Sequence, residues 1–222
     1  MVRPLSRRER ISLLLVIGAA GVASVLLQLN APIGQDVGDS VAALELVAAR
    51  GGPRREVQGA DLTLVVFTDY QCPACKLAHP AMERAVKADG RVRLQYKDWP
   101  IFGPMSEQAA RVAIAAYFQG IYPAVHDRLM RERRALGRPV LREAVEASGG
   151  DWKRIEHDLV RRALEIDRIL ARNQMDASRL NIAGTPAYLA GPYLVVGALS
   201  ESQFRQAFAN GRRAQKRWRS PT

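Results

Sequence analysis

The chain has 222 residues, of which 48% are hydrophobic and 25% are charged, a balance that excludes disorder along its whole length. Its formal net charge of +11 is typical of proteins that bind nucleic acid or anionic membrane surfaces. Four of the 33 basic residues precede the first apolar run and five lie in the last eleven residues. The others are spread along helical segments, without the interleaving of aromatic and basic residues that stacks bases, so we expect no nucleic-acid partner.

An apolar, uncharged run occupies residues 11–29, after a basic segment at residues 1–10. The run is about as long as a helix needs to cross a bilayer. Basic residues stay on the cytoplasmic side, so we expect a single-pass helix in a bacterial inner membrane with the rest of the chain in the periplasm. A cleaved signal peptide, with Gly21 and Ala23 near its cleavage site, is the alternative.

A linker is expected at residues 30–56, with a short helix at residues 39–50 that the sequence Gly-Gly-Pro then breaks. The domain that follows is expected at residues 57–210. A basic C-terminal tail is expected at residues 211–222.

The only two cysteines are Cys72 and Cys75, spaced C-x-x-C. A disulfide between them would close a very small ring, which stabilises a fold little. A zinc site needs two more ligands, and the three histidines at positions 79, 126 and 157 lack a paired spacing. The motif therefore predicts redox chemistry, without a metal and without a cofactor other than the redox-active disulfide.

A β-branched run at residues 62–68 predicts a buried strand before the motif, and residues 76–86 predict a helix after it. Cys72 is then expected at the positive end of a helix, as an exposed nucleophile whose thiolate the helix stabilises. Cys75, one turn later, is expected to be more buried and to resolve the mixed disulfide. Asp69 is either a proton acceptor for that buried thiol or a residue of the turn.

Residues 92–96 predict a half-exposed strand, and the chain from 106 to 175 has a helical pattern almost throughout. Two short strands are expected at residues 188–190 and 193–197. A closing helix follows Ser200, which with Gln203 suits a capping box. The helices expected within the helical stretch are 109–117, 124–134, 141–147 and 152–173.

Four residues near the cysteines are candidates for contact with a substrate polypeptide. Pro73 and Ala74 lie between the cysteines. The aromatic residues Tyr70 and Trp99 either line a groove for the substrate or pack at the rim of the core.

Five segments of the chain follow one another in an order known from one protein family: residues 65–75, 97–104, 106–127, 184–187 and 195–198. Together they resemble the DsbA-like branch of the thioredoxin superfamily. The resemblance implies an α/β, thioredoxin-like fold with an inserted helical domain at about residues 104–178, here preceded by the N-terminal transmembrane helix. It also implies that Pro186 is a cis proline facing the cysteine pair and that Thr185 tunes the redox behaviour.

The resemblance implies a thiol-disulfide oxidoreductase, and we expect a monomeric dithiol oxidase. Its partners would be exported protein thiols or disulfides and a membrane redox partner that recycles the site. The alternatives are an isomerase or reductant of the same fold, or a non-catalytic, membrane-tethered binding or chaperone module. Strongly oxidising relatives carry histidine at the position of Ala74, so a very oxidising potential is not implied.

Overall fold

The computed structural model describes residues 32–219 together with Arg8, Leu13, Val16 and Ile17. A transmembrane helix is expected at residues 11–29. Apart from Leu13, Val16 and Ile17, this segment lies outside the described residues. Within the described part of the chain, no helix combines the length and the apolar character that a membrane span requires.

A mixed β-sheet forms the centre of the domain, with strand order β1-β6-β5-β3-β4-β2. The central strand β3 pairs in parallel with β4 and antiparallel with β5. Every residue of β3 is buried, as its run of aliphatic and β-branched residues predicts. The bounds are β1 Gln35–Asp36, β2 Arg54–Arg55, β3 Leu62–Thr68, β4 Val92–Asp98, β5 Ala187–Ala190 and β6 Tyr193–Val196.

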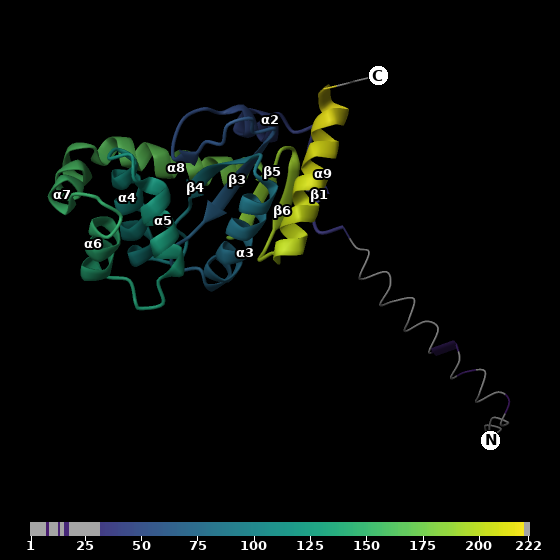
Figure 1. Ribbon diagram of the computed structural model, residues 1–222, viewed down its shortest axis with the longest axis horizontal. Coiled ribbons are helices and arrows are strands. Elements are labelled where there is room, and N and C mark those ends of the chain that lie inside the picture. Colours follow the sequence, from purple (N-terminus) through teal and green to yellow (C-terminus); the bar gives the residue numbers. More distant parts are fainter. Residues whose placement is uncertain (1–7, 9–12, 14–15, 18–31, 220–222) are drawn as a thin grey trace. The chain divides into compact units, whose positions relative to one another are not determined.

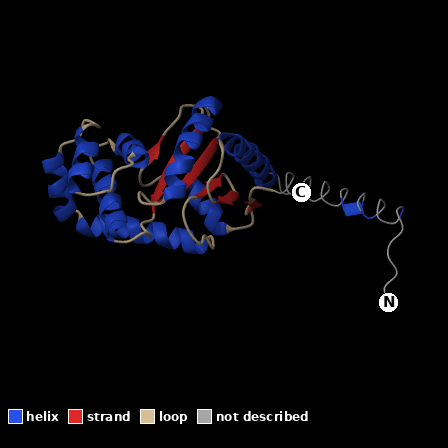
Figure 2. Cartoon of the chain, turned by 90° about the horizontal axis from the view of Figure 1, so that it is seen from below, coloured by secondary structure: helices blue, strands red, loops and turns tan. Residues whose placement is uncertain are grey.

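Helices cover both faces of the sheet (Figure 1, Figure 2). Helix α3 (Pro73–Asp89) packs beside α9 (Glu201–Arg219) on one face, where the ring of Tyr188 meets that of Phe204 edge-on. On the other face, α2 (Val41–Ala48) and α8 (Ala163–Arg179) pack against side chains that include Phe67 and Leu189. The alternation of neighbouring β-strand residues between the two faces explains this division.

The segment between β4 and β5 is helical, as the sequence predicts. The predicted helix at 152–173 is in fact two helices, because the backbone at Arg162 leaves helical geometry (φ −109°, ψ 19°). The helices of this insertion are α4 Pro104–Tyr117, α5 Tyr122–Arg131, α6 Arg138–Glu146, α7 Trp152–Arg161 and α8.

Helix α9 begins with the expected capping box. The backbone N–H of Ser200 donates to the side chain of Gln203, and the N–H of Gln203 donates to the Ser200 hydroxyl. The helix then continues to Arg219, so most of the expected basic tail is helical. Gly211, in this part of α9, is buried against the sheet, because the helix crosses β5 closely at this residue.

The crossing of α9 over β5 predicts a strong effect of the substitution Gly211→Ala. The added Cβ would lie 2.2 Å from the carbonyl oxygen of Ala190, and both atoms belong to packed elements. Alanine favours a helix by about 1 kcal/mol over glycine, but this backbone overlap costs more. We expect a net loss of about 1–3 kcal/mol in the free energy of unfolding, measured by urea denaturation.

The matched control is Gly51→Ala, where nothing lies within 4 Å of the added Cβ. This variant should stay within about 0.5 kcal/mol of the parent protein. Equal stabilities for the two variants would contradict the close contact between α9 and β5.

Candidate active site

The cysteine motif lies where the central strand β3 turns into helix α3. Cys72 is the N-cap residue of α3, and its Sγ accepts a hydrogen bond from the backbone N–H of Cys75 at 3.2 Å. Pro73 occupies the first turn of the helix, where an N–H is not needed. The sulfur of Cys72 therefore lies at the positive end of a helix dipole, as predicted from the sequence.

Both cysteines are free thiols, and both are buried. The prediction that Cys72 is exposed is wrong, because only 1% of the residue is accessible, compared with 3% for Cys75. The loop before β5 covers it: the Cys72 thiol donates to the carbonyl oxygen of Thr185 at 3.3 Å. The peptide bond between Thr185 and Pro186 is cis, as the resemblance implied.

The two thiols have different surroundings. Burial, together with the neighbouring sulfur of Cys72, raises the pKa of Cys75 to about 12. Polar groups nearby, from Asp69, Thr185 and Thr68, oppose this rise in pKa only in part. Cys75 is thus protonated at neutral pH, which suits a resolving thiol that reacts only after a mixed disulfide has formed.

Asp69 holds the loop beside the cysteines. Its carboxylate accepts hydrogen bonds from the backbone N–H groups of Gln71, Ile101 and Phe102 at 2.7–3.0 Å, and from the hydroxyl of Ser106 at 2.6 Å. Of the two roles left open by the sequence, this geometry favours the structural one. The carboxylate connects the turn before Cys72 to the start of α4.

The expected substrate-contacting role of Tyr70 is wrong, because Tyr70 is fully buried. Its hydroxyl lies 3.0 Å from Nδ1 of His126 and 3.3 Å from the hydroxyl of Tyr122. Tyr122 in turn donates to Asp98 at 2.7 Å. These four side chains, from β4, α5 and the turn after β3, form a buried polar cluster between the sheet and the helical insertion.

Burial determines the charges in this cluster. It raises the pKa of Asp98 to about 7 and also raises the pKa values of Tyr70 and Tyr122. It lowers the pKa of His126, so that this ring is neutral at pH 7. The Oδ2 atom of Asp98 has no hydrogen-bond partner among the described residues. Asp98 was not among the predicted site residues, although an acidic residue at the end of a strand parallel to β3 was a usable signal.

The surface near Cys72 is partly apolar. Pro73 is exposed and Ala74 is half-buried, which keeps both available for contact with a substrate. Trp99 is half-buried and packs against the core below α2 and α8. Two further apolar side chains are exposed: Leu77 on α3 is 75% exposed and Phe102 is 47% exposed. Neither was among the residues predicted to contact a substrate.

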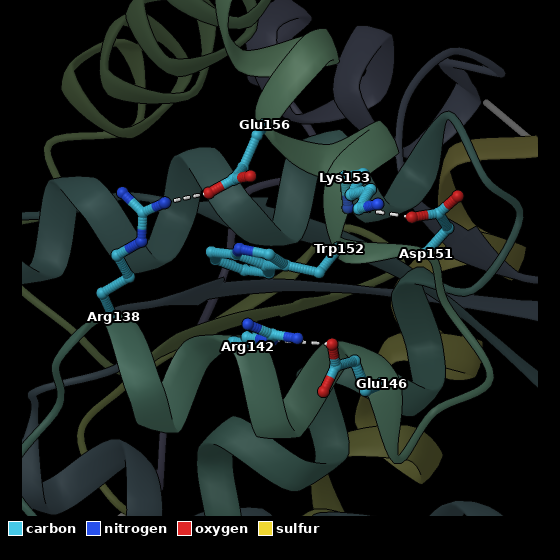
Figure 3. Close-up of a pocket in the computed structure, with 7 residues that line it drawn as sticks. All are labelled: Arg138, Arg142, Glu146, Asp151, Trp152, Lys153 and Glu156. Carbon is cyan, nitrogen blue, oxygen red and sulfur yellow. Dashed lines mark hydrogen bonds and ion pairs between the residues drawn. The ribbon is translucent and has the colours of Figure 1, made fainter.

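A pocket between α6 and α7 lies elsewhere in the fold and contains neither cysteine (Figure 3). Trp152 lies between Arg138 and Arg142, which pair with Glu156 and Glu146. The arginines and glutamates that line this pocket are thus paired with one another. In the described part of the chain, no cluster of three or more His, Cys, Asp or Glu side chains is arranged to hold a metal ion.

The buried carboxyl group predicts a pH-dependent stability. The pKa of Asp98 is higher in the folded protein, about 7, than in the unfolded chain, about 3.9. The resulting stabilisation is fully present below pH 4 and is lost as the pH rises through 7. Between pH 5 and pH 8.5 the parent protein should lose unfolding free energy as Asp98 ionises. In the Asp98→Asn variant we expect this loss to be about 2–3 kcal/mol smaller than in the parent.

Urea denaturation at the two pH values tests this expectation. The control Asp167→Asn changes a carboxylate that is 53% exposed, and it should leave the pH dependence as it is. An Asp98→Asn protein with the parent's pH dependence would show that the carboxyl group is ionised in the folded state throughout.

Other proteins share this fold. Residues 63–209, well over half of the chain, match the family described as DSBA-like thioredoxin domain. A thioredoxin-like oxidoreductase from Silicibacter pomeroyi is 30% identical, with a TM-score of 0.68 over 80% of this chain and 96% of that one. The catalytic domain of ScsC from Proteus mirabilis is 25% identical, with a TM-score of 0.67 over 81% and 98%.

A curated relative is much longer than this chain. The Na(+)/H(+) antiporter NhaA 3 of Salinispora tropica is 29% identical over 197 residues, which are 83% of this chain but only 29% of the antiporter. The likeness therefore concerns one part of that protein. Through residues 63–209, which carry the cysteine pair, the helical insertion and the cis-proline loop, the chain belongs to the DSBA-like thioredoxin domain family.

Proposed function

We propose that this protein is a thiol-disulfide oxidoreductase that reacts through Cys72 and Cys75. The observation that carries the proposal is the position of the Cys72 sulfur. It lies at the start of α3, 3.2 Å from the N–H of Cys75 and 3.3 Å from the carbonyl of Thr185. Positive helix ends stabilise thiolates, and the loop beside the sulfur offers an edge along which an extended polypeptide can lie.

The proposed direction is dithiol oxidation of exported proteins. A substrate thiolate attacks the Cys72 sulfur of the Cys72–Cys75 disulfide, and Cys75 leaves and takes up a proton. A second substrate thiolate then attacks the substrate sulfur of the mixed disulfide and releases Cys72. The substrate loses two electrons and gains a disulfide, while the protein's disulfide becomes two thiols. A membrane redox partner would reoxidise them.

The arrangement of residues 34–56 supports a monomer. An isomerase of this fold commonly needs a separate dimerisation segment to shield its site. Here β1 and β2 form the two edges of the sheet, and α2 packs on its face. The segment is therefore used within the domain, which favours an oxidase over an isomerase or a reductant.

The proposed location is the periplasmic side of a bacterial inner membrane, with residues 11–29 as a single-pass anchor. The support is the length of the apolar run and the basic residues that precede it. Cleavage after a signal peptide would instead release the domain into the periplasm.

Serine substitutions separate the roles of the two cysteines. With a peptide that carries a disulfide, we expect Cys75→Ser to accumulate a mixed disulfide at Cys72, because the resolving thiol is absent. We expect Cys72→Ser to form essentially none, since Cys75 is buried and protonated at neutral pH. Mass spectrometry of the quenched reaction measures both adducts.

The same experiment addresses the non-catalytic alternative. If the Cys72→Ser protein exchanged disulfides as fast as the parent, the cysteine pair would not be the reaction centre. A binding or chaperone module would then be the better description of this domain.

The reduction potential of the Cys72–Cys75 pair tests the direction of electron flow. Equilibration of the full chain in detergent against glutathione buffers, followed by alkylation and mass spectrometry, measures it. We expect a value above that of thioredoxin, about −270 mV, and below that of the strongly oxidising DsbA, about −120 mV, because no histidine lies between the cysteines. A value at or below that of thioredoxin would overturn the oxidase proposal in favour of a reductant.

A further inference from the structure

Three buried hydrogen-bond donors at one edge of the sheet have no partner in the described part of the chain. They are Nη2 of Arg54, Nε of Arg93 and Nε2 of Gln95. Buried polar groups in folded proteins are nearly always hydrogen-bonded, because an unmatched donor has lost its water without compensation. Three such donors therefore point to an acceptor that residues 32–219 do not supply.

Strand pairing brings these donors together. Arg54 in β2 is the direct partner of Gln95 in β4, and Arg93 lies two residues before Gln95 in the same strand. Side chains of paired residues, and of alternate residues in one strand, lie on the same face of a sheet. The neighbouring Arg55 lies on the other face, where it pairs with Glu83 of α3. The three donors thus form one cluster on the face that α2 covers.

A pocket of about 130 Å³ lies at this cluster, between the β2–β4 edge of the sheet and the last residues of α2. All three donor residues line it. Gln95 is the most deeply buried of them, with only 3% of the residue exposed. The pocket has the volume of roughly four water molecules, which is enough for one phosphate group with its oxygens.

Positive charge dominates this pocket. Arg50, which is exposed, lines it together with Arg54 and Arg93, and Glu56 is the one acidic residue among its described lining residues. Glu56 accepts from Nη1 of Arg54 at 3.1 Å and lies 3.8 Å from Nη1 of Arg93, so it engages neither buried donor. The end of α2 adds a weak negative potential, which three guanidinium groups outweigh.

A phosphate group matches this set of donors better than water or a carboxylate does. A water molecule brings no net charge, and its own hydrogens need acceptors in turn. A carboxylate has two oxygens and one charge, whereas a phosphate monoester carries nearly two charges at pH 7 and offers three strong acceptor oxygens. Arginine suits phosphate in particular, because its planar N–H groups match the spacing of the oxygens.

We propose that this pocket binds a phosphate group, either as the free ion or as the end of a small phosphate ester. The oxygens would accept from Arg54, Arg93 and Gln95 and so connect β2 to β4 beside the end of α2. Strand β2 has only two residues and lies at the edge of the sheet, so a ligand that bridges the two strands would hold this edge in place. The site lies on the opposite face of the sheet from α3 and goes beyond the proposed thiol-disulfide exchange.

Isothermal titration calorimetry tests the proposal with the full chain in nonionic detergent. Inorganic phosphate, glycerol 3-phosphate and acetate are titrated separately into chloride buffer at constant ionic strength. We expect saturable binding of phosphate at one site, and binding of acetate that is weaker by about tenfold or more. Tighter binding of glycerol 3-phosphate than of inorganic phosphate would identify an ester as the ligand, and the reverse order would identify the free ion.

Substitution of Gln95 by methionine tests the site without changing the net charge. Methionine resembles glutamine in shape but has no N–H donor, so in Gln95→Met the phosphate affinity should fall by about tenfold or more. Arg93→Met, at a half-buried position, should have the same effect and serves if Gln95→Met does not fold. Its matched control is Arg161→Met, an exposed arginine on α7, which should keep the parent's affinity.

Hydrogen exchange with mass spectrometry locates the bound ion. Residues 41–58 include α2 and β2, and at about ten times the Kd of phosphate their exchange should slow by up to about tenfold. This protection should vanish in Gln95→Met and Arg93→Met. Absence of saturable phosphate binding, equal affinity for acetate, parent-like affinity in both variants, or protection confined to other segments would overturn the proposal.

Discussion

The geometry around the cysteines depends on one buried carboxylate. Asp69 accepts four hydrogen bonds, three from backbone N–H groups and one from Ser106. These bonds connect the turn that carries Cys72 to the segment after β4 and to the first turn of α4. A buried carboxylate is tolerated only when its oxygens are satisfied in this way. The start of the helical insertion and the start of α3 are therefore held in register by the same side chain.

The polar cluster of Tyr70, Asp98, Tyr122 and His126 fills the junction between the sheet and the insertion. An apolar junction would give stability with less need for exact orientation, whereas hydrogen-bonded hydroxyl and ring groups require particular partners. The cluster thus fixes how α5 lies against β4. Its least satisfied member, Asp98, lies at the end of β4 beside the end of β3, so a proton bound there is close to the segment that leads to Cys72.

Local sequence signals predicted much of this structure. The β-branched run at 62–68 is β3, the capping box starts α9, and the C-x-x-C motif lies at the start of a helix, as expected. The two-residue strands β1 and β2 were missed because their pairing depends on partners far along the chain. The burial of Cys72 and Tyr70 was missed for the same reason, since it is caused by the loop at Thr185 and by α5. Helical periodicity also continues across Arg162, where a change of backbone direction separates α7 from α8.

The loop at Thr185 has a consequence for chemical damage. A thiolate at a helix end is vulnerable to peroxide, which converts it to sulfenic acid and then to acids that are not readily reduced. Here the same carbonyl that contacts the Cys72 sulfur also covers it, and only 1% of the residue meets solvent. Small oxidants in solution thus find little of the sulfur. If the protein reacts as proposed, a polypeptide substrate would have to displace this contact first, so the sulfur would be exposed only to a bound substrate.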